Sequence, residues 1–143
     1  MENKEILKII PLVLYFIVGI ISLIMALKIL LSGKFLPFHE KAAGKSWKEV
    51  EAPLQNVILS LLKLGGLGFL VVAVLLLVYP FVARVSPDTF YKFLIPIIAL
   101  IFCTGLFFNN YWLYKKTKTD TPWKGSLYAI IIVLAGFIIS LFN

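Results

Sequence analysis

The residues of this chain that could do acid–base chemistry at neutral pH are few, and two of them are adjacent. His39, the only histidine, directly precedes Glu40 in a connection between two apolar stretches. An imidazole titrates close to neutrality, so a His–Glu pair contains the groups needed for general acid and general base catalysis. The alternative is a solvated pair in an exposed loop. We take His39 and Glu40 as the candidate catalytic residues and expect the solvated alternative to hold.

A second group of polar side chains lies inside the apolar stretches or next to their ends, where polar groups are costly and therefore informative. Each type also has a structural explanation, because lysine extends to the headgroups, asparagine bridges helices and tryptophan anchors the interface. These polar and aromatic side chains lie toward the same end of the expected helices. The candidate ligand-binding residues are Lys63, Asn109, Asn110, Trp47, Gln55, Asn56 and Ser60.

Residue counts exclude several other kinds of site. One histidine and one cysteine cannot supply the usual ligand set of a zinc or haem site. The apolar stretches contain no acidic residue, which argues against pumps built on buried carboxylates. The sequence has no phosphate-binding loop and no nucleophile elbow. We therefore expect no metal and no cofactor.

The elements that must position these residues are long apolar helices. Residues 9–27, 64–83, 93–114 and 125–143 contain no Asp, Glu, Lys, Arg or His. A bilayer core needs roughly 20 apolar residues per helix, and each of these runs has about that length. The sequence therefore predicts an all-α polytopic membrane protein, a four-helix transmembrane bundle in one domain over residues 1–143. The expected spans are residues 9–31, 62–83, 89–114 and 123–142, the first being too long for a signal peptide.

Local signals place the ends of these helices. Pro37 can open a short helix that Gly44 closes, and Ser46 with Glu49 forms a capping box. The second long helix is thus expected to begin near Ser46, well before its span. Its extension is amphipathic, with a possible bend at Pro53. The apolar stripe of this extension consists of Leu54, Val57, Ile58, Leu61 and Leu62.

Three further signals concern the remaining helices. Gly65, Gly66 and Gly68 favour close helix packing within the protein over a dimer seam. The sequence at 86–88, Ser-Pro-Asp, predicts the start of the third helix, and Thr121 with Pro122 predicts the start of the fourth.

The distribution of positive charge predicts the orientation. The net charge of +7 lies almost entirely at span ends and in short loops, so we exclude nucleic acid as a partner. The first and third connections carry eight lysines, whereas the N-terminal tail and the second connection carry four positive residues. The positive-inside rule therefore predicts an inner (plasma) membrane protein with cytoplasmic loops at 32–53 and 115–122 and both termini outside.

Short motifs add a resemblance. The Pro37–His39 segment, then Trp47 and Gln55 before a Gly-rich span, and Thr121–Trp123 before the fourth span resemble a group of small bacterial four-span membrane proteins with no assigned activity. The resemblance covers most of the chain and implies the same topology, without implying a reaction.

From these features we expect a lipid or another lipophilic molecule to bind on the side of the long first loop. Lys63, Asn109 and Asn110 would anchor it, under a lid containing His39 and Trp47. Membrane lipids are the expected partners, and a second copy or another membrane protein could complete an assembly. The alternatives are a membrane enzyme acting on a lipophilic substrate through His39 and Glu40, and a transporter or channel subunit.

Overall fold

The computed structural model describes residues 2–85 and 89–142 and is built from helices. The long helices are α1 (Glu2–Leu30), α3 (Ala52–Val85), α4 (Thr89–Thr117) and α5 (Trp123–Leu141). Each contains a stretch long and apolar enough to cross a membrane, as predicted. The first connection adds a short helix, α2 (Pro37–Ala43), and a single 3-10 turn at Trp47–Glu49. The predicted helix start at residues 86–88 lies outside the described residues.

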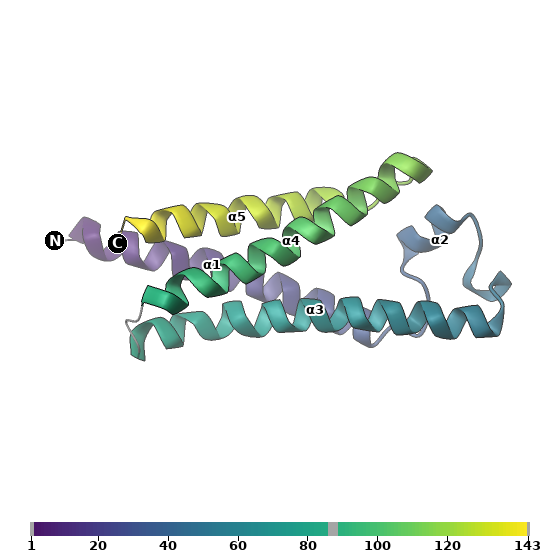
Figure 1. Ribbon diagram of the computed structural model, residues 1–143, viewed down its shortest axis with the longest axis horizontal. Coiled ribbons are helices and arrows are strands. Elements are labelled where there is room, and N and C mark those ends of the chain that lie inside the picture. Colours follow the sequence, from purple (N-terminus) through teal and green to yellow (C-terminus); the bar gives the residue numbers. More distant parts are fainter. Residues whose placement is uncertain (1, 86–88, 143) are drawn as a thin grey trace.

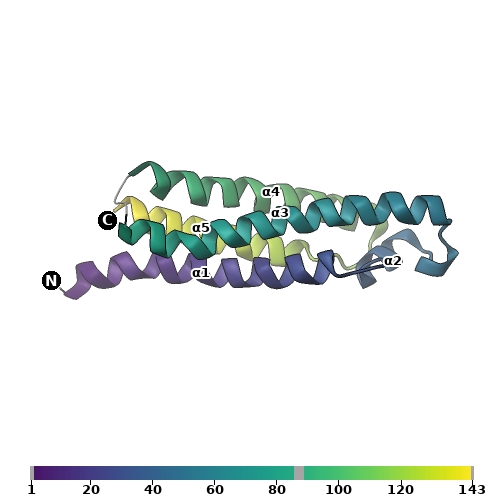
Figure 2. The same cartoon turned by 90° about the horizontal axis from the view of Figure 1, so that it is seen from below.

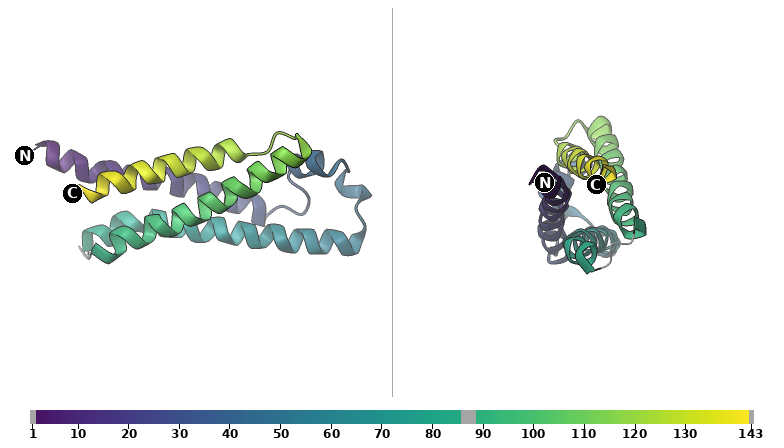
Figure 3. Two further views of the ribbon diagram at one scale, coloured as in Figure 1. Left: turned by 45° about the horizontal axis from the view of Figure 1, so that its top comes forward. Right: turned by 90° about the vertical axis from the view of Figure 1, so that its left-hand side faces the viewer.

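The four long helices run alternately up and down, so both termini lie at one end of the bundle and α2 lies at the other (Figures 1 and 2). The core occupies the half nearer the termini, and α1 and α3 make the most extensive contact of any helix pair. Toward the end of the bundle that carries α2, helices α3 and α4 diverge (Figure 3). The core side chains are Tyr15, Val18, Val72, Leu76, Tyr79, Ile95, Ala99 and Val133.

The glycines at the start of the second span allow close approach to neighbouring helices, as predicted for two of the three. A Cβ on Gly66 would lie 3.0 Å from Leu30, and one on Gly68 would overlap the ring of Phe102. A Cβ on Gly65 would meet nothing within 4 Å. Gly66 therefore brings α3 close to α1, and Gly68 brings it close to α4.

The predicted start of the second long helix at Ser46 is wrong by several residues. The capping box is present, because the Ser46 N–H donates to Glu49 Oε2 at 2.9 Å, but it closes only the 3-10 turn. Val50 is extended, and α3 begins at Ala52. A helix continuing through this region would press the ring of Pro53 against the carbonyl of Glu49. The amphipathic extension is therefore the part of α3 that begins at Ala52 and precedes residue 62.

The cap predicted for the fourth helix is also different. Helix α5 begins at Trp123, but the Thr121 hydroxyl donates to the backbone carbonyl of Asn110 at 2.7 Å and does not cap α5. Thr121 is buried, and this bond ties the last connection to α4.

Candidate functional site

The first connection is anchored by apolar side chains on one side of α2. Phe35 and Leu36 are buried immediately before the helix, and Pro37 supplies its first residue. Gly44 ends α2 in the left-handed conformation, with a φ of 63°, as predicted. Phe35 also packs edge-on against Trp47, with 4.8 Å between ring centroids. These contacts anchor the two ends of the connection around α2, whose own residues are not buried.

Two candidate residues maintain the shape of this connection. Glu40 Oε1 accepts the backbone N–H of Trp47 at 3.1 Å. Gln55 Nε2 donates to the carbonyls of Trp47 and Val50, each at 2.9 Å. The carbonyls left without a continuing helix by the break before Pro53 thus gain a side-chain donor. Glu40 and Gln55 connect α2 to α3 and stabilise the loop.

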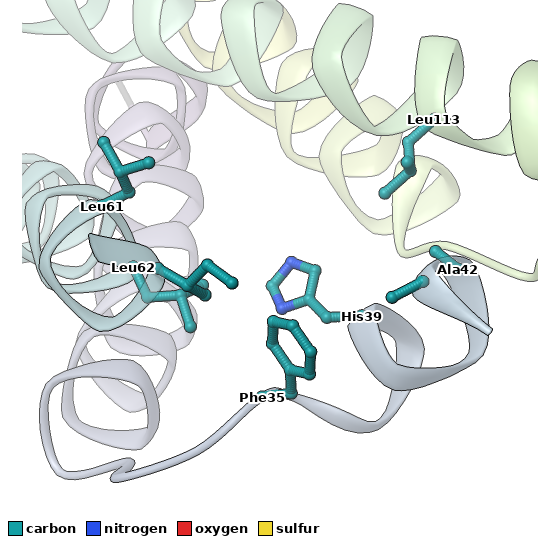
Figure 4. A pocket seen from close by; sticks show the side chains of 8 residues that line it. Phe35, His39, Ala42, Leu61, Leu62 and Leu113 are labelled. Atoms are coloured by element: carbon teal, nitrogen blue, oxygen red, sulfur yellow. The ribbon is translucent and has the colours of Figure 1, made fainter. Parts of the chain in front are cut away.

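A pocket lies beneath α2, in the space where α3 and α4 diverge (Figure 4). Its volume is about 370 Å³, within the range of small-molecule sites. It is bounded by α2 and by Phe35, two residues before it, by the first turns of α3, and by the end of α4. The lining residues are Phe35, His39, Ala42, Ala43, Ile58, Leu61, Leu62 and Leu113.

His39 is the one polar side chain among these lining residues. Its imidazole projects from α2 into the space between Leu62 and Leu113, with the Phe35 ring beside it (Figure 4). Nδ1 is buried and has no hydrogen-bond partner within the described chain. Burial lowers the pKa of His39 from its usual 6.5, because the apolar surroundings disfavour the charged ring. At neutral pH the pocket therefore presents a neutral imidazole.

The structure places the other candidate ligand-binding residues elsewhere. Lys63, Asn109, Asn56 and Ser60 are exposed, and none of them lines the pocket. Asn110 bridges two helices, since its Nδ2 donates to Ser126 Oγ at 3.4 Å and its carbonyl accepts from Thr121. Trp47 reaches the pocket through Phe35, which it packs against. The structure therefore joins His39 and Trp47 to the pocket and leaves the three predicted anchors outside its lining.

Sequence reasoning missed most of the pocket wall because the wall is apolar. Leu113 was hidden among the aromatic residues that end α4, and Ala42 and Ala43 carry no chemical signal. One clue was available, since two small residues in a helix of seven leave room beside His39. The apolar stripe of α3 was recognised, and three of its members, Ile58, Leu61 and Leu62, line the pocket.

This arrangement is suited to binding. The carboxylate of Glu40 holds the backbone of Trp47, whereas the imidazole of His39 points into the pocket. In the described residues no three His, Cys, Asp or Glu side chains come together as metal ligands would. An apolar pocket with one neutral imidazole can hold an apolar body and exchange a hydrogen bond with one polar group.

Comparison with known proteins adds no information about the function of this pocket. No family model, no curated protein and no solved structure matches the chain. The resemblance to bacterial four-span proteins thus remains an expectation from short motifs.

Proposed function

We propose that this four-helix membrane protein binds a lipid or another lipophilic molecule in the pocket beneath α2. The observation that carries the proposal is the open apolar pocket of about 370 Å³ with a single, incompletely hydrogen-bonded imidazole. A buried polar atom without a partner costs roughly 1–3 kcal/mol. A ligand that fills the cavity and supplies a polar group to the ring would recover part of that cost.

The position of the pocket supports a ligand that arrives from the membrane. Helices α3 and α4, which form two of its walls, make the least extensive contact of the helix pairs that pack along the bundle. Leu61, which lines the pocket, is also exposed, so the surface of α3 beside the pocket is apolar. A lipophilic molecule can therefore approach between α3 and α4 without crossing a polar surface.

Filling the pocket tests the proposal. Leu62→Trp places a large ring in the cavity, whereas Leu64→Trp makes the same change on the outer surface of α3, where Leu64 is 61% exposed. Native mass spectrometry with lipidomics on gently extracted protein should show one retained lipophilic species in the wild type. We expect Leu64→Trp to keep it and Leu62→Trp to lose at least about tenfold in occupancy.

Two results would overturn the proposal. One is a wild-type protein that retains no ligand in stoichiometric amounts. The other is a retained species that is equally abundant in the folded Leu62→Trp and Leu64→Trp proteins, because such a species binds outside the pocket.

A further inference from the structure

A second apolar pocket lies along the same two helices, closer to the termini. Its volume is about 500 Å³. On α3 the first pocket ends at Leu62 and the second begins at Val74. On the antiparallel α4 the order is reversed, with Leu113 in the first pocket and Ile98 in the second. The second pocket is lined by Val74, Leu75, Val78, Val82, Leu94, Ile95 and Ile98.

Between these pockets α3 and α4 come into close contact at Gly68 and Phe102. The absence of a side chain at Gly68 makes the room, since a Cβ there would overlap Cε2 of Phe102. Phe69 fixes the same ring edge-on, with centroids 5.2 Å apart. Phe102 also packs against the core cluster. The ring is thus held in place across the line that joins the two pockets.

From this contact we infer that Phe102 sets the maximum length of the ligand. The inference rests on the proposed function and adds a chemical class, a linear amphiphile. Its polar group would lie at His39, and its tail would run between α3 and α4 until it meets Phe102. The axial distance from Ile58 to Gly68 is about 15 Å, at about 1.5 Å per helical residue. A tail longer than this depth would meet the Phe102 ring and would have to leave the gap between α3 and α4.

Straight-chain alcohols are suitable probes, because a hydroxyl can exchange a hydrogen bond with a neutral imidazole. A series with tails of about eight to about eighteen carbons samples the depth one or two buried methylenes at a time. Occupancy is measured by native mass spectrometry of the protein in nanodiscs. Each value is divided by the amount of that alcohol in empty nanodiscs, which removes simple partition into lipid.

We expect the wild type to show a cut-off, with occupancy falling about tenfold for each methylene that cannot be accommodated. Phe102→Ala should move the cut-off to longer tails, and Phe102→Leu should move it less in the same direction. The matched control is Phe108→Ala on the same helix, where the ring is 64% exposed and its loss should leave the cut-off unchanged. If the alanine variant does not fold, the leucine variant provides the test.

An unchanged cut-off in a folded Phe102 variant, or a wild type with no cut-off, would overturn the inference. That failure is distinct from failure of the proposed function. If Leu62→Trp abolishes binding of every tail while the Phe102 variants behave as wild type, the pocket binds the ligand and Phe102 does not limit its length.

Discussion

The imidazole of His39 is enclosed by apolar neighbours, and its chemistry follows from that enclosure. The ring lies 3.9 Å from Phe38 and 6.1 Å from Phe35 between centroids. Glu40, the neighbouring carboxylate, is engaged with the backbone of Trp47. No ion pair to His39 is found among the described residues. Burial is therefore the effect that shifts its pKa, and the direction is downward.

This shift makes the docking of α2 pH-dependent. Above its usual pKa of 6.5 the ring is neutral whether α2 is docked or released. As the pH falls below 6.5, the released form takes up a proton, while the docked form resists protonation until its own lower pKa is reached. The equilibrium constant for docking of α2 is thus unaffected by this ring above pH 6.5. Between pH 6.5 and the lower pKa of the docked form, it falls by up to about tenfold per pH unit. Hydrogen exchange of residues 37–47 in nanodiscs, corrected for intrinsic rates, should increase between about pH 7.5 and about pH 5.5.

Two variants separate His39 from its surroundings. His39→Leu should abolish the pH dependence, since no other group in the pocket lining titrates. Glu40→Gln should preserve it, because the amide oxygen can still accept the N–H of Trp47. Persistent pH dependence in His39→Leu would assign the effect to another residue.

The sequence alone indicated that His39 and Gln55 belong to the candidate site, but the role of each depended on the fold. The sequence identified Gln55 as a polar residue near the membrane, and only the break before Pro53 shows why its amide is needed by two carbonyls. Lys63 and Asn109 carried the same signal as Gln55, yet both are exposed. Polarity indicated which residues were unusual, whereas packing determined which of them meet.

At the scale of helices, length and apolar composition were sufficient to predict four long elements. Their exact starts were harder, because two local rules competed at the beginning of α3. The capping box at Ser46 favours a helix, and Pro53 opposes its continuation, so the structure contains a single turn and then a new helix. Which side chains meet between helices was harder to predict, because contacts such as Tyr15 with Gly136 join distant parts of the chain.

The contact between α1 and α5 provides a stability prediction. A Cβ on Gly136 would lie 2.7 Å from Cε1 of Tyr15, a fully buried side chain in the core. Gly136→Ala should therefore lower the free energy of unfolding by about 1–3 kcal/mol through overpacking. Thermal unfolding in detergent, monitored by circular dichroism, measures the change.

Gly105→Ala is the matched control on α4. An added Cβ at Gly105 meets nothing within 4 Å, so the substitution should be neutral or stabilising through the greater helix propensity of alanine. Equal losses of stability in both variants would show that the effect comes from the helix backbone and not from the Tyr15 contact.

For the molecule as a whole, the four-span topology followed from the sequence because lipid forces each apolar run to form its own hydrogen bonds as a helix. The sequence did not predict that the bundle packs more tightly near the termini than near α2. Core residues such as Val72 and Leu76 look the same in sequence as Leu61 and Leu62, which line the pocket. The difference lies in the arrangement of α3 and α4, which are in close contact at Gly68 and Phe102 and diverge toward α2.

The final prediction concerns the orientation of the whole bundle. Lys28 and Lys63 lie toward the same end as the eight lysines of the first and third connections, which strengthens the charge asymmetry. The positive-inside rule predicts α2 and the pocket on the cytoplasmic side and both termini on the opposite side. In a Cys103→Ala background, Ile6→Cys should react with a membrane-impermeant maleimide in intact cells. Ser46→Cys, which is exposed at the α2 end, should react only after permeabilisation.

Labelling of Ser46→Cys in intact cells would show that the orientation is the reverse of the predicted one or that both orientations coexist. The result also determines which lipids can reach the pocket. With the α2 end in the cytoplasm, a ligand entering between α3 and α4 comes from the cytoplasmic leaflet. In the proposed binding mode its polar group would lie beside His39, and its tail would point toward Phe102. The reverse orientation would keep the same geometry but draw the ligand from the outer leaflet.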